Sequence, residues 1–163
     1  MKTAVVYYSL SGHTEEAAQT IARDLQADLI RLSPVTPYPA KGLAKYFHGG
    51  RSALKGDAPV LTPYAFSGDY DLVIFGTPVW ASNFVPPLRT FIRDNREALK
   101  GKKLAAYICL MGGGGEKALA RLREALGVEK LAAEMSLVDA KGKNAGGQEE
   151  LIRQFCAACR NSQ

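Results

Sequence analysis

Short apolar segments alternate with amphipathic ones along most of the chain. Five segments rich in β-branched and aromatic residues are predicted to be strands, at 3–8, 28–32, 71–76, 104–110 and 131–138. Between them, apolar side chains recur at helical spacing, which predicts helices over 14–25, from residue 86 onward, over 118–126 and over 148–159. This alternation predicts an α/β fold with a parallel sheet and helices on both faces, most simply as one domain over residues 1–163.

The segment between the second and third predicted strands is the least regular. Residues 33–68 contain five prolines, which interrupt regular structure. A helix over 41–54 is predicted within this segment, although Gly49 and Gly50 weaken the prediction. We expect the whole segment to lie on the surface of the sheet.

The predicted helix from residue 86 onward has a basic outer side. Arg89, Arg93, Arg96 and Lys100 form this stripe, while apolar side chains occupy the opposite side. We expect all four cations to be solvated.

The turn after the first predicted strand carries the strongest chemical signal. Ser9, Ser11 and Thr14 supply hydroxyl groups, and Gly12 lets the backbone close on a ligand. At such a helix N-terminus, unpaired N–H groups and the helix dipole favour an anion. The turn contains no Lys or Arg, so neutral donors would have to hold any phosphate.

Other phosphate-binding and catalytic motifs do not occur in the sequence. The first turn lacks GxxxxGK[ST], and the glycines at 112–115 do not fit GxGxxG because Lys117 stands in place of the third glycine. No cysteine follows the first strand, as a Cys-x5-Arg loop would require. A GxSxG sequence and a cluster of metal-ligating residues are also missing, so we assign neither catalytic residues nor a metal site.

Three loops are expected to meet at the carboxyl edge of the sheet, where ligands of such folds bind. They comprise residues 9–14, 77–83 and 110–115, and they are rich in hydroxyl, glycine or aromatic residues. These loops contain no pair of residues suited to general acid–base catalysis. Their composition therefore favours a cofactor-binding site rather than a hydrolytic active site.

The sequence from Ser9 to Thr14 resembles the phosphate loop of flavodoxins, [ST]-x-[ST]-G-x-T, which binds the phosphate of FMN with hydroxyls and backbone amides. Gly76-Thr77-Pro78-Val79-Trp80 resembles the second flavodoxin loop, which lays an aromatic ring along the flavin. The predicted strands and helices are similar to that fold over essentially the whole chain. The resemblance implies a flavodoxin-like three-layer sandwich, a five-stranded parallel sheet in the order 2-1-3-4-5, and FMN as the cofactor.

The resemblance also implies roles for the residues of the three loops. The phosphate would be held by Ser9, Ser11, Gly12, His13 and Thr14. Thr77 would reach the ribityl chain or the phosphate, the ring system would be lined by Pro78, Val79 and Trp80, and its polar edge would lie near Ala81, Ser82 and Asn83. The pyrimidine side would be approached by the backbone of Leu110, Met111, Gly112 and Gly113. Three alternatives stay open: His13 using only its N–H, Trp80 as a packing residue, and Met111 as a gap filler.

The sequence departs from the flavodoxin electron carriers in three respects. It is basic, whereas those carriers are typically acidic. Ala81 follows the tryptophan of the second loop, where the carriers commonly have a glycine whose peptide can turn toward the reduced flavin. The third loop supplies glycines in place of a second aromatic ring, which predicts that one face of the flavin is open.

Composition and charge narrow the range of partners. The formal charge of +5 predicts a mildly basic, solvated surface or an acidic partner, and aromatic residues are not interleaved with Lys and Arg as nucleic-acid readers require. No apolar run approaches the roughly 20 residues of a membrane span.

Three cysteines and the lack of a secretory leader predict a cytoplasmic location. Cys156 and Cys159 have CxxC spacing but are expected to be two thiols on a helix.

These features lead to three hypotheses on function. In the first, an FMN oxidoreductase takes electrons from NADH or NADPH and passes them to a quinone-like or other small acceptor, and Lys41, Lys45 or Arg51 meets a nucleotide phosphate. The second hypothesis is a one-electron carrier between redox proteins, and the third is an interaction module without flavin. The oligomeric state is open between a monomer and a homodimer.

Overall fold

A computed structural model describes residues 1–41, 43–138 and 145–162, with the backbone alone described at 43, 45–47, 145 and 146. Its centre is a parallel five-stranded sheet in the order β2-β1-β3-β4-β5, the order expected from the resemblance. The strands are β1 (Thr3–Tyr7), β2 (Asp28–Arg31), β3 (Leu72–Pro78), β4 (Lys103–Leu110) and β5 (Glu134–Val138). β1 pairs with β2 on one side and with β3 on the other, so the direction of strand order reverses at β1.

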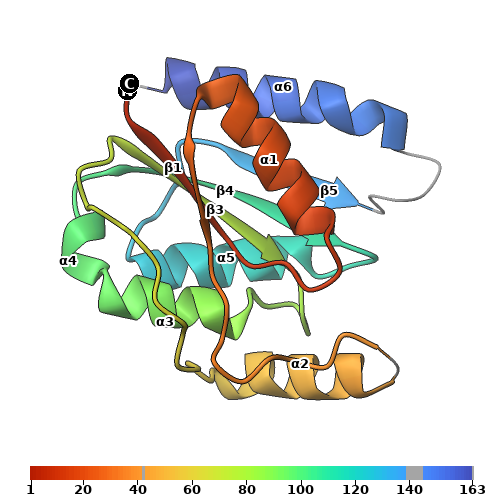
Figure 1. Ribbon diagram of the computed structural model, residues 1–163. Coiled ribbons are helices and arrows are strands. Elements are labelled where there is room, and N and C mark those ends of the chain that lie inside the picture. The colour runs from red at the N-terminus through yellow and green to blue at the C-terminus, as the bar shows by residue number, and fades with distance from the viewer. Residues whose placement is uncertain (42, 139–144, 163) are drawn as a thin grey trace.

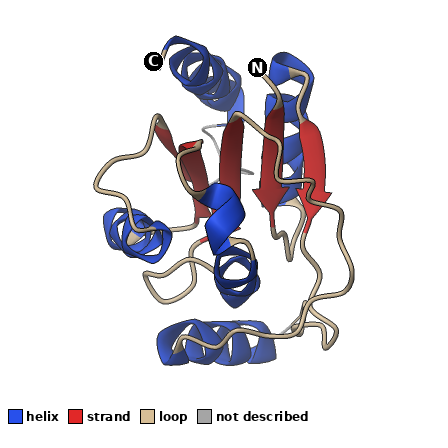
Figure 2. Ribbon diagram, turned by 90° about the vertical axis from the view of Figure 1, so that its left-hand side faces the viewer, coloured by secondary structure: helices blue, strands red, loops and turns tan. Residues whose placement is uncertain are grey.

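Helices cover both faces of this sheet (Figures 1 and 2). One face carries α1 (His13–Leu25) and α6 (Ala145–Asn161), while the other carries α3 (Pro86–Asp94), α4 (Arg96–Leu99) and α5 (Gly115–Leu126). The predicted three-layer α/β sandwich is therefore confirmed.

The core is divided by the sheet into two apolar clusters. Val73 and Phe75 of β3 pack with Leu88 and Phe91 of α3, because alternate side chains of a strand point to the same face. Ile74 belongs to the opposite cluster, beneath α1 and α6. Cys156 and Cys159 are buried there as free thiols on α6, as expected for a structural role.

Several predicted boundaries need correction. The helix that begins at Pro86 ends at Asp94, because the backbone of Asn95 leaves the helical conformation (φ −114°, ψ 17°). The side-chain amide of Asn95 donates to the carbonyl of Phe91 (2.9 Å), and the short helix α4 follows. The predicted basic stripe is therefore interrupted after Arg93. β3 extends through Pro78, two residues further than predicted, and β5 begins at Glu134 rather than at residue 131.

The segment 33–68 was expected to lie wholly on the surface of the sheet, and this is wrong for its helix. α2 (Leu43–Lys55) lies apart from the sheet, beyond the layer of α3 and α5 (Figures 1 and 2). It packs instead beside the loop that follows β3, where the side-chain amide of Asn83 donates to the carbonyl of Ala53 (3.0 Å).

The described residues contain no helix that combines the length and the apolar character needed to cross a membrane. Within the same ranges, no group of three or more His, Cys, Asp or Glu side chains is placed to hold a metal ion.

Candidate functional site

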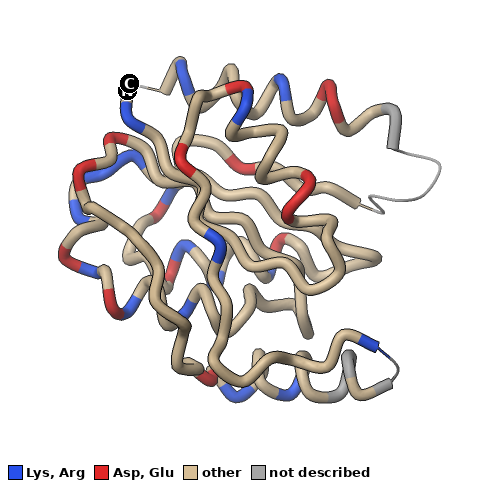
Figure 3. The backbone as a smooth tube through the Cα atoms, viewed as in Figure 1, with Lys and Arg blue, Asp and Glu red and all other residues tan. Residues whose placement is uncertain are grey.

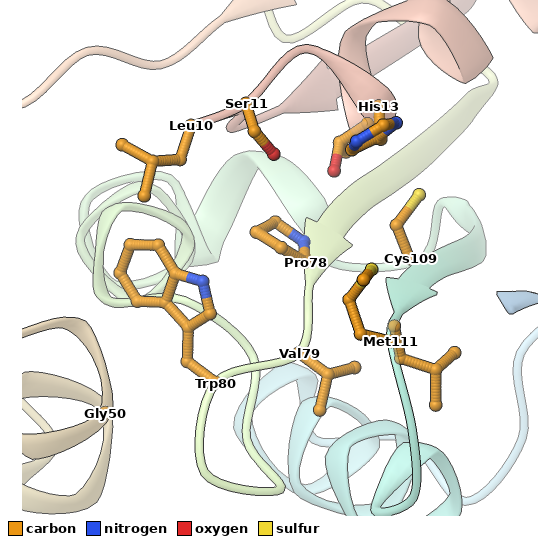
Figure 4. A pocket seen from close by; sticks show the side chains of 11 residues that line it. Leu10, Ser11, His13, Gly50, Pro78, Val79, Trp80, Cys109 and Met111 are labelled. Atoms are coloured by element: carbon orange, nitrogen blue, oxygen red, sulfur yellow. The ribbon is translucent and has the colours of Figure 1, made fainter. Parts of the chain in front are cut away.

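A cavity of about 280 Å³ lies at the carboxyl ends of β1, β3 and β4, next to the point where strand order reverses (Figure 4). Its lining comes from all three predicted loops and from α2, and carries no charged residue: Leu10, Ser11, His13, Thr14, Gly50, Pro78, Val79, Trp80, Cys109, Leu110 and Met111. The site is thus uncharged in a protein that is basic overall (Figure 3).

The loop between β1 and α1 is shaped to leave backbone donors free. Gly12 precedes α1 with a left-handed backbone (φ 98°), and its N–H donates to the hydroxyl of Ser9 (3.1 Å). The first helical hydrogen bond runs from the N–H of Glu16 to the carbonyl of Gly12 (2.9 Å). No side chain of the described residues caps this helix end, so the N–H groups of its first turn are available to a ligand.

A buried tyrosine fastens this loop to the sheet. The hydroxyl of Tyr107 on β4 donates to the carbonyl of Thr14 (2.8 Å). Its ring passes over Gly76 of β3, where any Cβ would overlap the ring. Burial raises the pKa of Tyr107 well above its ordinary value, so the phenol stays a neutral donor. The first turn of α1 therefore has a fixed height above the sheet.

The side chains of Ser11 and His13 point into the cavity (Figure 4). Ser11 is exposed, whereas the Nδ1 atom of His13 is buried and has no hydrogen-bond partner among the described residues. A buried polar atom without a protein partner is one that a bound ligand could satisfy. Glu15, in the same helical turn, is paired with Arg31 (2.8 Å), which offsets its negative charge near the cavity.

The loop after β3 brings an indole to the opposite wall. The ring of Trp80 packs edge to face with Tyr8 (centroids 5.6 Å apart) and Tyr38 (5.1 Å). A Cβ on Gly49 of α2 would lie 3.1 Å from Cε3 of Trp80, so this glycine allows a close approach to the indole, whereas a Cβ on Gly50 would meet only the Cβ of Ala81 at 3.9 Å. Of the two glycines that weakened the helix prediction, Gly49 therefore has a packing role.

A tight two-residue turn follows Trp80. The backbones of Trp80 and Asn83 exchange both hydrogen bonds (2.9 and 3.0 Å), and Ala81 and Ser82 between them have positive φ angles of 50° and 57°. Positive φ at both central residues is the pattern of a type I′ hairpin turn, which glycine or asparagine usually occupies. Ala81 thus holds a glycine-like backbone conformation without being glycine.

Thr77 and Asn83 do not line the cavity, in contrast to their predicted positions. Because β3 continues through Pro78, Thr77 shares the face of Phe75, and its hydroxyl donates to the carbonyl of Pro78 (2.7 Å) and accepts from the N–H of Val85 (3.1 Å). Asn83 is buried against α2, and its carbonyl oxygen accepts from the N–H of Phe84 (2.9 Å). Both side chains shape the loop rather than face a ligand.

The third loop leaves its side of the cavity uncovered. Met111 is 81% exposed, and a Cβ placed on Gly112 or Gly113 would meet no atom within 4 Å. Only Leu110 and Met111 of this loop line the cavity. Gly114 lies against the second loop, where its Cβ would come 3.1 Å from Cα of Ser82.

Comparison with known proteins identifies this arrangement. Residues 2–152 match the family described as flavodoxin. The chain belongs to the flavodoxin family. This is a family of FMN-binding flavoproteins, and the family predicted from Ser9–Thr14 and Gly76–Trp80 is confirmed.

Solved structures with this fold include several flavoproteins. A flavoprotein from Lactobacillus acidophilus NCFM in complex with FMN is 19% identical, with a TM-score of 0.72 over 90% of this chain and 97% of that one. A putative flavoprotein from Bacteroides eggerthii is 20% identical, with a TM-score of 0.74 over 98% of each chain. Flavodoxin 1 from Bacillus cereus, in its oxidised form, is 17% identical, with a TM-score of 0.58 over 100% of this chain and 99% of that one.

The residues of this flavodoxin-family cavity fit FMN chemically. Free N–H groups, the exposed hydroxyl of Ser11 and the orphaned Nδ1 of His13 suit a phosphate. Pro78, Val79, Trp80 and Leu110 offer apolar surface to a planar ring. Burial raises the pKa of Cys109, on the floor of the cavity, to about 11, so it presents a neutral thiol there.

Of the predicted site residues, eight line the cavity: Ser11, His13, Thr14, Pro78, Val79, Trp80, Leu110 and Met111. Eight do not line it: Ser9, Gly12, Thr77, Ala81, Ser82, Asn83, Gly112 and Gly113. Sequence reasoning missed Leu10, Gly50 and Cys109. Leu10 and Cys109 stood beside the predicted residues, whereas no local pattern marked Gly50, which enters from α2.

Proposed function

We propose that this flavodoxin-family protein binds FMN in the cavity and transfers electrons from a reduced nicotinamide cofactor to a small quinone-like acceptor. Bound FMN would supply the redox chemistry by accepting electrons from one reactant and passing them to the next. The chain's own residues would bind the cofactor, orient it and control which reactants reach it.

The phosphate of FMN would occupy the N-terminus of α1. The N–H groups of the first turn and the hydroxyl of Ser11 would donate to its oxygens, and the helix dipole would favour its charge. Protonated at Nδ1, His13 would donate as well, which would satisfy an atom that is buried without a partner. Because Tyr107 fixes the height of this turn, the distance from phosphate to ring would be set by the sheet.

The ring of FMN would lie between the second and third loops. Pro78 and Trp80 would line one side, with the indole held in place by Tyr8, Tyr38 and α2. The opposite side would be bordered by Leu110 and Met111.

The observation that carries the proposal is the open third loop. Exposed Met111 and two unobstructed glycines stand where an aromatic ring would cover the flavin. A planar second reactant, such as a nicotinamide or a quinone, could therefore stack against the ring. A carrier that serves only protein partners has no need of this access.

Cations of the 33–68 segment could assist a nucleotide donor. Lys41 and Arg51 are exposed, while the side chain of Lys45 lies outside the described residues. Their contribution would be an ionic attraction for a nucleotide phosphate at the rim of the cavity.

Steady-state assays with NADH and NADPH against a quinone test the proposal. We expect turnover well above that of an equal concentration of free FMN, and we expect Met111→Trp, which places a ring at the open side, to lower it. Two separate one-electron waves in a potentiometric titration, without turnover, would favour the carrier. A purified protein that is colourless and takes up no FMN would favour the flavin-free module.

A further inference from the structure

A second cavity, of about 420 Å³, lies between the C-terminal end of α2, the start of α3 and the middle of α5. Its lining includes three cations, Lys55, Arg89 and Arg121, beside the carboxylate of Glu124. It shares no lining residue with the first cavity, although both border α2 and the loop after β3. Of the three predicted loops, only the second contributes to its lining, through Asn83.

Arg89 was expected to be solvated, and this is wrong. Its side chain is half-buried, with the guanidinium over the ring of Phe84 at 4.6 Å from the centroid. The Nε atom is buried and has no hydrogen-bond partner among the described residues. Burial, followed by repulsion from Arg121, lowers the pKa of Arg89. Burying the charged guanidinium of Arg89 on α3 without a partner for Nε therefore costs folding free energy.

Arg121 faces the same cavity from α5. One of its nitrogens, Nη1, donates to the carbonyl of Ser82 (3.0 Å), which fixes the guanidinium beside the turn of the second loop. Among the described residues, no ion pair includes Arg89, Arg121 or Lys55, and Glu124 lines the cavity without pairing with them. Two guanidinium groups thus share one hollow, and neither is paired with a carboxylate of the described residues.

We propose that this cavity binds a phosphate group, held by the guanidinium groups of Arg89 and Arg121 with Lys55 at the rim. Guanidinium groups match phosphate oxygens in charge and in geometry, and a phosphate would satisfy the orphaned Nε and remove the repulsion between the arginines. The cavity is large enough for more than an inorganic ion. The source is therefore free phosphate or the phosphate of a nucleotide such as NADP. The proposal does not require the proposed function.

Isothermal titration calorimetry on FMN-saturated protein tests the site, with sodium phosphate, NADP+ and NAD+ as probes. We expect phosphate or NADP+ to bind the wild-type protein and to bind Arg121→Gln and Arg89→Gln at least about tenfold more weakly, since each variant removes a charge-assisted hydrogen bond. Arg93→Gln is the matched control, because Arg93 is exposed on the same helix and pairs with Asp94. Affinity for NADP+ without affinity for NAD+ or free phosphate would identify a nucleotide as the source.

Two results would overturn the proposal: no heat with either phosphate or NADP+, or equal binding by the wild-type protein and both arginine variants. Thermal melts of each variant verify folding. If a Gln variant unfolds, Arg121→Lys replaces it, because lysine keeps the positive charge but cannot make the bidentate hydrogen bonds of a guanidinium. If the chain takes up no flavin, the titration is run without it. Loss of binding in Arg121→Gln, and not in Ser11→Ala, then assigns the phosphate to this cavity.

Discussion

The loop before α1 and the loop after β3 face each other across the first cavity, but different kinds of contact hold them. The first is built almost entirely by neighbours in sequence: Ser9 accepts from Gly12, Gly12 turns left-handed, and the helix begins. A buried long-range bond, from the hydroxyl of Tyr107 to the carbonyl of Thr14, fixes its height.

The second loop depends on three other elements. Asn83 donates to Ala53 of α2, Arg121 of α5 donates to Ser82, and the hydroxyl of Thr77 accepts from Val85 at the start of α3. The loop to which we assign the phosphate of FMN is therefore held mainly by local contacts, whereas the loop to which we assign the ring is held by tertiary contacts. Changes in the first loop should therefore alter binding, whereas changes around the second should alter both binding and folding.

Gly76→Ala disturbs Tyr107, the buried long-range support of the first loop, and should have the largest effect. The added Cβ overlaps the ring of Tyr107, which is fully buried and cannot withdraw. We expect a loss of about 3 kcal/mol in the free energy of unfolding, measured by urea denaturation, together with weakened FMN binding.

Gly113→Ala is the control for that substitution, since its Cβ meets no atom within 4 Å. Equal stability of the two variants would show that Tyr107 does not support the first loop.

Ser11→Ala combined with Thr14→Val tests whether the first loop acts on binding alone. Both side chains line the cavity, and at about 1 kcal/mol or more per lost hydrogen bond we expect FMN affinity to fall by about 2–3 kcal/mol. The melting temperature of the flavin-free protein should stay close to that of the wild-type protein. Gln19→Ala, at an exposed position of α1, is the control. Unchanged affinity in the double variant would refute the phosphate assignment.

Neighbouring glycines of α2 test the tertiary character of the second loop. Gly49→Ala places a Cβ 3.1 Å from the indole of Trp80, whereas Gly50→Ala reaches only the Cβ of Ala81 at 3.9 Å. We expect Gly49→Ala to lower FMN affinity and to destabilise the fold by about 1 kcal/mol. Gly50→Ala should stabilise α2 by up to about 1 kcal/mol. The same response in both variants would mean that α2 does not position the tryptophan.

Two of the buried thiols, Cys109 and Cys159, give the smallest signal, and Cys109 reports whether the first loop stays closed. Burial raises the pKa of Cys109, beneath this loop, and of Cys159, on α6, to about 11. At about pH 8 only roughly one molecule in a thousand then carries a given thiolate, so both should react slowly with Ellman's reagent until urea unfolds the chain. Faster reaction of Cys109 alone would show that the first loop opens.

The same pKa values predict a pH dependence of stability. Because folding raises these pKa values, the folded state favours the protonated thiols, so their contribution is complete at neutral pH. We expect the free energy of unfolding to fall as the pH rises from about 9 to about 11. A flat profile in urea denaturation over this range would contradict the burial of the thiols.

The local character of the first loop also explains what could be predicted from sequence. Strand periodicity and Gly12 act within a few residues, so the strands and the turn before α1 followed from the sequence pattern, and the sheet order followed from the resemblance. The side chain of Thr77 points away from the cavity because β3 is two residues longer than the pattern predicted. Gly50 lines the cavity because the proline-rich segment 33–68 brings α2 beside it, and local sequence does not specify that path. Arg89 looked like any surface arginine, because Phe84 and Arg121 meet it only in the folded chain.

The most direct test of the account compares FMN with riboflavin, which has the same ring system and lacks the phosphate. Fluorescence titration of the flavin-free protein measures both affinities under one condition. We expect FMN to bind tightly and riboflavin to bind at least about 100-fold more weakly, since several charge-assisted hydrogen bonds are lost with the phosphate. Equal affinities for the two flavins, or no binding of either, would contradict it.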